Sequence, residues 1–172
     1  SPAVLWTNNL AASDRPYAQL LEQARRQQMQ MNMPTKGDRL EIGRGRLTCL
    51  RNLSADSGTR SGEGGKGNDR GLVIRASLGR FALLFPGDIG QSMERELTDM
   101  DEDLAATILL SPHHGSKTSN SRTFLAAVAP EYLIVSAGSR QSAHFPHPGL
   151  ERQSEDLGIS MMTTGRDGTI VA

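Results

Sequence analysis

A single cysteine, Cys49, is the first shortage in this sequence of 172 residues, and it excludes an internal disulfide and any zinc cluster built on several thiolates. Its place in a strand-like run favours a small buried side chain. Net charge is also lacking, because lysine plus arginine equal aspartate plus glutamate at 19 each. The chain as a whole therefore has no basic excess of the kind that drives non-specific nucleic-acid binding.

Long apolar runs are missing as well. No stretch approaches the roughly 18 to 20 apolar residues that a membrane-spanning helix requires, and the N-terminus has neither the basic nor the apolar region of a signal peptide. The chain is long enough to bury a core without a disulfide or a structural metal. We therefore expect one soluble domain over residues 1–172.

The charge is segregated along the chain. Residues 36–80 contain ten Lys or Arg against five Asp or Glu, whereas residues 88–103 contain one Arg against seven acids. A basic stretch of this kind is typical either of a surface that faces a phosphate-bearing substrate or of an ordinary solvated face.

The hydrophobic pattern predicts an α/β fold, with hairpins first and alternating strands and helices later. Residues 54–69 are rich in glycine and serine and cannot bury apolar surface, so we expect a flexible loop there rather than a domain boundary. The segments before and after Asp88 are candidates for the two sheets of a layered sandwich. The expected elements are a strand at 3–6, a helix at 14–29, hairpins at 39–50 and 72–85, a helix at 91–100, a strand at 107–110, a helix at 121–128, a strand at 132–136, a helix at 149–157, a strand at 159–163 and an edge strand at 169–171.

Two of the expected strands end at residues of types that commonly serve as metal ligands. The apolar run 81–85 stops at Pro-Gly-Asp88, and the run 107–110 stops just before His113 and His114. A carboxylate and imidazoles at neighbouring strand ends can converge on one divalent cation. Taken alone, Asp88 also has an ordinary explanation, because aspartate after glycine is common in tight turns.

The two adjacent histidines differ in what they can reach. In an extended backbone, neighbouring side chains point to opposite sides. We therefore expect one of His113 and His114 to bind the metal and the other to orient or flank it, and the sequence leaves open which one binds.

The turn after the histidines is polar and carries one cation. A capped helix start is one interpretation, with Ser119 or Asn120 as the cap. The other interpretation is a phosphate-binding site. The two interpretations are compatible, because one turn can cap a helix and bind a phosphate. The order of residues is not that of a Walker loop, because the required glycines and the Gly-Lys-Ser/Thr order are absent. The residues with donors that suit a phosphate oxygen are Gly115, Ser116, Lys117 and Thr118, of which Lys117 is also a catalytic candidate.

His144 and His147 lie at a third expected strand end, in a segment held rigidly by Pro146 and Pro148. Either histidine is a candidate for metal ligand, for proton donor to a leaving group, or for phosphate partner.

Together these segments resemble the carboxyl-terminal half of a metallo-β-lactamase-fold domain, of the kind attached to ComEC-type DNA-uptake (competence) membrane proteins. The resemblance implies a layered αββα sandwich that is incomplete in its N-terminal half. It also implies that Asp88 bridges two metal ions, that one histidine of the pair completes one of them, and that the later His-Pro segment lies beside the substrate. The specific matches are Gly87-Asp88 and His113-His114-Gly115-Ser116, and the resemblance covers 37–40 with the strand after it, 68–75, 83–88, 112–119, 130–138, 144–148 and 164–170.

The sequence departs from the family pattern at two places. The principal ligand cluster of the family, His-x-(His/Asp)-x-Asp-His, should come before residue 1, and no such string occurs in these residues. Because metals in this fold take ligands from both halves, we expect weak metal binding and little turnover from these residues alone. Phe145 separates His144 from Pro146, which leaves open which histidine takes the family role.

The resemblance implies a hydrolase domain in which one or two Zn²⁺ or Mn²⁺ ions activate water to cleave a nucleic-acid phosphodiester. The implied partners are single-stranded DNA and the rest of a membrane channel protein, and the implied location is the extracytoplasmic side of a bacterial inner membrane. One alternative is a non-catalytic module that guides DNA or assists assembly without metals. Another is hydrolysis of a small ester or lactam, because the fold serves many substrates.

Overall fold

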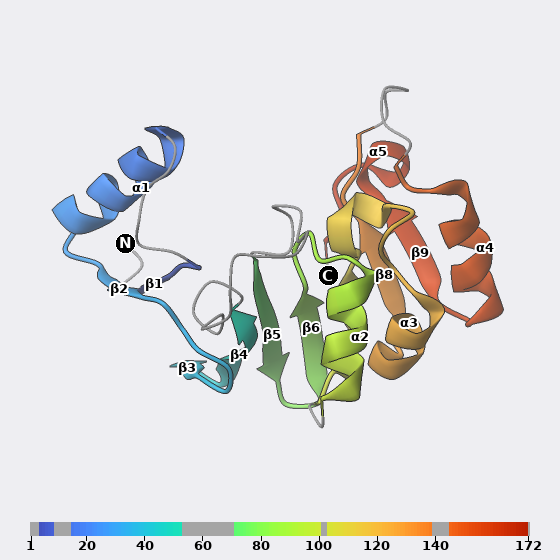
Figure 1. The fold of residues 1–172 in the computed structure, drawn as a ribbon, viewed down its shortest axis with the longest axis horizontal. Helices are drawn as coiled ribbons and strands as arrows, with labels where there is room; N and C mark the ends of the chain where they lie inside the picture. The colour runs from blue at the N-terminus through green and yellow to red at the C-terminus, as the bar shows by residue number, and fades with distance from the viewer. Residues whose placement is uncertain (1–3, 9–14, 53–70, 101–102, 139–144, 172) are drawn as a thin grey trace.

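A seven-stranded mixed sheet is the centre of the computed structural model, which describes residues 4–8, 15–52, 71–100, 103–138 and 145–171 (Figure 1). The expected loop at 54–69 and the side chain of His144 lie outside these ranges. Strands β3 to β6 pair antiparallel, and β6 to β9 pair parallel. The strands follow one another in chain order: β3 (Arg39–Ile42), β4 (Gly45–Asn52), β5 (Leu72–Leu78), β6 (Phe81–Phe85), β7 (Ile108–Leu110), β8 (Tyr132–Val135) and β9 (Ser160–Thr163).

Three helices, α2 (Gln91–Asp99), α3 (Arg122–Val128) and α4 (Pro148–Asp156), cover one face of this sheet (Figure 1). The core beneath them contains a row of leucines from three adjacent strands, since Leu84 aligns with Leu109 in the register and Leu109 with Leu133. All three are fully buried, and each such side chain contributes about 1.5–3 kcal/mol relative to exposure. This core fixes the strands at whose ends the candidate residues lie.

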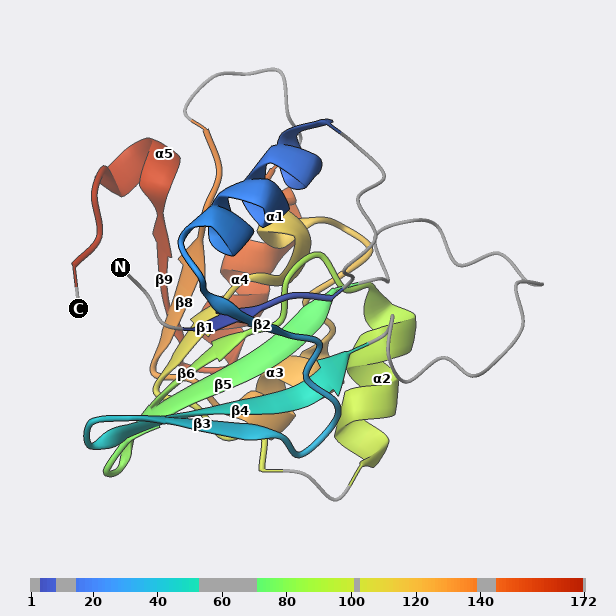
Figure 2. The ribbon, with the colours of Figure 1, turned by 90° about the vertical axis from the view of Figure 1, so that its left-hand side faces the viewer.

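The other face of the sheet is turned toward a smaller layer. Strands β1 (Val4–Trp6) and β2 (Gln30–Asn32) form a two-stranded parallel sheet, and helix α1 (Arg15–Arg26) lies beyond it (Figures 1 and 2). Phe81 and Phe85 alternate along β6 with buried residues and remain 37% and 39% exposed on this side. The layers therefore run helix, small sheet, large sheet, helices, which agrees with the expected α/β sandwich.

Two expectations from the sequence are wrong, and one strand was missed. The segments on either side of Asp88 do not form two sheets, because β6 and β7 pair side by side in one sheet. The strand β2 was not expected. Residues 169–171 form no edge strand, because the chain turns into the short helix α5 (Thr164–Asp167). The turn is held by the Asp167 carboxylate, which accepts a hydrogen bond from the Thr163 N–H at 2.8 Å.

Within the described ranges, none of the helices combines the length and apolar character that a transmembrane segment requires.

Candidate functional site

Three parallel strands, β6, β7 and β8, end at the same edge of the sheet, and each is followed by a residue of the candidate site. Asp88 follows β6, the turn Pro112–Gly115 follows β7, and Ser136 follows β8. The strand ends are tied together by backbone hydrogen bonds, since the His113 N–H donates to the Gly87 carbonyl at 3.1 Å. The topology thus brings together residues that are far apart in the sequence.

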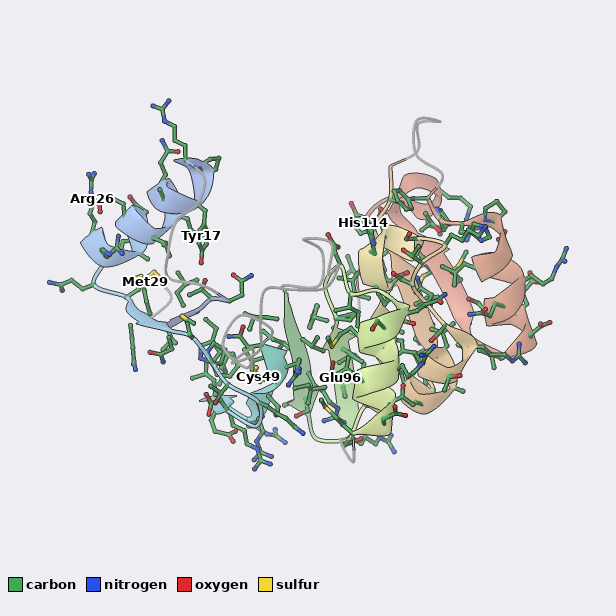
Figure 3. The ribbon with its side chains drawn as sticks, viewed as in Figure 1. Tyr17, Arg26, Met29, Cys49, Glu96 and His114 are labelled. Carbon is green, nitrogen blue, oxygen red and sulfur yellow. The ribbon has the colours of Figure 1, made fainter. Side chains whose placement is uncertain are left out.

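His114 is oriented toward Asp88. Its Nδ1 lies 2.8 Å from the carbonyl oxygen of Ser136, and because a carbonyl can only accept, Nδ1 carries the proton. The neutral ring therefore has its lone pair on Nε2, which lies 3.8 Å from Oδ1 of Asp88. Both side chains are about half exposed, at 49% and 52%. Figure 3 shows His114 at the upper end of the sheet, with Cys49 and Glu96 lower in the view.

Two electron-rich atoms that face each other at this distance are suited to a shared cation. A backbone carbonyl that fixes the ring through the other nitrogen is the usual support of a metal-binding histidine. Metal bonds of about 2.0–2.2 Å place two ligand atoms about 3–3.5 Å apart, so Asp88 and His114 need only a small movement to share one ion. No group of three or more His, Cys, Asp or Glu side chains converges within the described part of the chain. Among the described residues, Asp88 and His114 are thus a pair of side chains whose chemistry and spacing suit a metal ion.

The backbone at the histidine pair is not extended, contrary to the expectation. His113 and His114 both have left-handed conformations, with φ of 47° and 56°. The two rings consequently do not point to opposite sides of a strand. His113 is half-buried, and its ring centroid lies 5.9 Å from that of Phe145, whereas His114 reaches Asp88.

The polar turn after the histidines uses much of its hydrogen-bonding capacity internally. The Ser116 N–H donates to the His113 carbonyl and the Ser119 N–H to the Ser116 carbonyl. The Ser116 hydroxyl lies 3.1 Å from that of Thr118. The sequence suggested that this turn presents amides to a phosphate, but the amides of Ser116 and Ser119 already have acceptors. The side chains of Lys117 and Thr118 are exposed.

The expected cap of the next helix is also corrected. Neither Ser119 nor Asn120 caps α3, because the Ser119 hydroxyl donates to the Ile89 carbonyl at 2.8 Å. The cap is Ser121, whose hydroxyl oxygen accepts from the Phe124 N–H.

Glu94 is a structural residue that reasoning from the sequence missed. Its carboxylate is fully buried and accepts hydrogen bonds from the N–H groups of Asn120 and Ser121 at 2.5 and 2.8 Å. Burial raises the pKa of Glu94, and the hydrogen bonds from Ser121 and Asn120 oppose that effect. A signal was present, because Glu94 stands three residues before Leu97 in the buried stripe of α2.

His147 lies beside the turn as an N-cap of α4. The Nδ1 atom of its ring accepts a hydrogen bond from the Gly149 N–H at 3.2 Å. The backbone N–H of His147 donates to the Gly115 carbonyl at 2.8 Å. Gly115 has φ of 79°, and a Cβ there would lie 2.9 Å from the Cβ of Pro146. Glycine at this position therefore lets the segment that carries His147 approach the histidine turn closely. His144 lies outside the described residues.

The chain is similar in sequence to competence proteins. The chain is 33% identical over 104 residues to competence protein ComA of Neisseria gonorrhoeae, which covers 60% of this chain and 15% of that protein. The chain is a distant homologue of the ComA-type competence proteins. It is also 26% identical over 151 residues to ComE operon protein 3 of Bacillus subtilis strain 168, with 88% of this chain and 19% of that protein covered. It thus spans less than a fifth of the length of these two relatives.

The fold is similar to that of a solved hydrolase structure. The crystal structure of a provisionally assigned metal-dependent hydrolase from Parabacteroides distasonis matches with a TM-score of 0.54, over 96% of this chain and 78% of that one, at 13% identity. This likeness concerns the fold alone, and it confirms the expected mixed α/β, metallo-β-lactamase-like architecture. No protein-family model matches the chain.

Proposed function

We propose that this chain contributes part of a metal-dependent site that hydrolyses nucleic-acid phosphodiesters within a longer competence protein. The observation that carries the proposal is the pairing of Asp88 with His114 at adjacent strand ends, with Nδ1 of His114 held by the Ser136 carbonyl. The homology to competence proteins supports the choice of DNA as substrate.

The residues of this chain have distinct roles in the proposed site. Asp88 and the Nε2 atom of His114 hold a Zn²⁺ or Mn²⁺ ion, which supplies Lewis acidity and an activated water when bound. The Ser136 carbonyl keeps the His114 ring in the tautomer that binds metal. Lys117 neutralises a phosphate oxygen, and His147 or His144 assists proton transfer to the leaving group.

The remaining ligands come, in this proposal, from the preceding part of the longer protein. That protein holds the site on the extracytoplasmic side of a bacterial inner membrane, where single-stranded DNA and the membrane channel are its partners. The basic residues 36–80 fit such a substrate, because they provide counter-charges for phosphates.

The test compares the longer protein with its Asp88→Asn, His114→Gln and His113→Gln variants. Cleavage of single-stranded DNA is measured with Mn²⁺ and with Zn²⁺ added. Loss of a metal ligand should lower the rate at least about 10- to 100-fold, whereas His113→Gln should retain most of the activity. Equal cleavage by the wild type and the Asp88→Asn variant would contradict the proposal.

A second candidate is a DNA-guiding module that works without metals. The observation that favours it is that the described residues bring together two metal-binding side chains rather than three. Metal analysis of the longer protein separates the candidates. Metal-free protein that binds single-stranded DNA, with an affinity that falls as salt rises, would favour the module.

A further inference from the structure

A separate pocket lies next to the Asp88–His114 pair, where helices α2, α3 and α4 begin. Its volume is about 330 Å³. Its lining includes the cations Lys117 and Arg122 together with His147 and Gln153, and contains no Asp or Glu among the described residues. Such a combination of cations and neutral donors suits an anion.

The two cations are available to a ligand. The Lys117 side chain is exposed and forms no hydrogen bond or ion pair with the described residues. Arg122 lies 3.6 Å from Asp156, with both side chains more than half exposed, at 59% and 58%. Exposed pairs of this kind contribute only about 0–1 kcal/mol, so Arg122 can turn to a phosphate at little cost.

The neutral groups add donors to the same pocket. Because Nδ1 of His147 accepts from the Gly149 N–H, the neutral ring carries its proton on Nε2. The Gln153 amide is fixed through a hydrogen bond of 2.6 Å from its Nε2 to the Asn120 carbonyl, and its second N–H remains as a donor. The helices α2 and α4 begin at Gln91 and Pro148, and their N-terminal ends add partial positive charge.

A buried carboxylate, that of Glu94, lies behind the pocket wall and accepts hydrogen bonds from backbone amides. Asn120 and Ser121 line the pocket, and Glu94 lies behind them with one oxygen bonded to each backbone N–H. Its carboxylate therefore faces amide donors rather than the pocket.

Residues that line the pocket follow closely after Asp88 and His114 in the sequence. Gln91 follows Asp88 by three residues, and Lys117 follows His114 by three. Three residues span at most about 11 Å, so one strand of nucleic acid can reach both places.

We infer that this pocket is a second subsite that binds a phosphate of the nucleic-acid strand beside the phosphate at the Asp88–His114 pair. The choice of a nucleic-acid phosphate rests on the proposed function. The subsite holds the strand in register through Lys117, Arg122, His147 and Gln153. Arg122 and Gln153 act in binding alone, whereas Lys117 and His147 also serve the reaction in the proposed function.

The test uses the 172-residue chain and a fluorescein-labelled oligothymidine, with binding followed by fluorescence anisotropy at several salt concentrations. The variants are Lys117→Ala and Arg122→Ala, alone and combined. The matched controls are Arg95→Ala and Arg152→Ala, which remove exposed cations that do not line the pocket. Circular dichroism verifies that each variant is folded. If Arg122→Ala unfolds, Arg122→Gln replaces it.

Each pocket variant should weaken binding about 5- to 10-fold and lower the salt slope by about 1, while the controls change affinity less than about twofold. Asp88→Asn should leave the pattern intact. Equal affinities of the pocket and control variants would overturn the inference, as would binding of inorganic pyrophosphate, but not of DNA, through Arg122. If the binding pattern holds and the longer protein cleaves no DNA, the hydrolase proposal fails and the subsite stands.

Discussion

The buried carboxylate of Glu94 accepts a hydrogen bond from the backbone N–H of Asn120, 26 residues away in the chain. Asn120 has a left-handed conformation with φ of 62°, and its side chain accepts from the Ser111 hydroxyl and donates to the Pro112 carbonyl. Ser111 and Pro112 lead directly into the histidine turn. Glu94 therefore fixes, through Asn120, the segment that positions His114.

Removal of this carboxylate should destabilise the protein. In Glu94→Ala, the buried N–H of Asn120 and the partly buried N–H of Ser121 lose their acceptor, and each unsatisfied buried group costs about 1–3 kcal/mol. We expect the free energy of unfolding to fall by about 2–4 kcal/mol, measured by urea denaturation at neutral pH. Glu155→Ala, at an exposed position of α4, serves as the control and should change stability by less than about 0.5 kcal/mol. A similar effect of both variants would show that Glu94 has no special structural role.

The same residue should make stability depend on pH. Burial raises the pKa of Glu94 above the ordinary 4.5, so between these two values the folded state binds more protons than the unfolded state. Stability from this group is therefore full below pH 4.5 and is lost as the pH rises through the raised pKa. Glu94→Gln does not titrate, so the stability of the wild type minus that of the variant should decrease from pH 4 to pH 8. A constant or increasing difference in urea denaturation would contradict the prediction.

Much of the fold was predictable because its strands and helices follow local rules. The apolar run at 81–85 and the alternating pattern after it indicate buried strands and amphipathic helices, and β6, α2, β7, α3, β8 and α4 lie close to the expected ranges. The pairing of Asp88 with a histidine followed from their positions at neighbouring strand ends. Local pattern and topology were sufficient for these features.

The backbone conformation of the histidine turn and the cap of α3 depend on tertiary contacts that no local sequence pattern encodes. The left-handed backbone of His113 and His114 depends on the hydrogen bond of His113 to Gly87 and on Asn120, which is held by Glu94. The choice of Ser121 as cap follows from the same contact, because Glu94 fixes Asn120 and Ser121 together. A carboxylate in an apolar stripe was the one sequence signal for this network.

The tautomer of His114 is a direct prediction of the site geometry. Nδ1 donates to the Ser136 carbonyl, so at alkaline pH the neutral ring should carry its proton on Nδ1, which is the less common tautomer in free histidine. Long-range ¹⁵N–¹H NMR of the imidazole distinguishes the two forms. His147 provides an internal comparison, because its Nδ1 accepts a hydrogen bond and its proton should be on Nε2. Observation of the Nε2–H form for His114 would remove the lone pair that the proposed metal requires.

Gly115 should be the glycine least tolerant of substitution around the site. In Gly115→Ala, the left-handed backbone becomes unfavourable by about 1–2 kcal/mol, because the residue now carries a Cβ. The new Cβ also lies 2.9 Å from the Cβ of Pro146. Such overlap in a packed region adds about 1–3 kcal/mol. We therefore expect a loss of about 2–5 kcal/mol in the free energy of unfolding.

Gly158→Ala is the matched control for this substitution. Gly158 has a similar φ of 71°, but a Cβ there would meet nothing within 4 Å. It should lose only the backbone component of about 1–2 kcal/mol, so the difference between the two variants isolates the contact with Pro146. Because the His147 N–H donates to the Gly115 carbonyl, displacement of this segment should also shift the imidazole NMR signals of His147 in Gly115→Ala and leave them unchanged in Gly158→Ala. Equal losses of stability, with unchanged His147 signals, would mean that the loop yields freely and that glycine is not needed there for close approach.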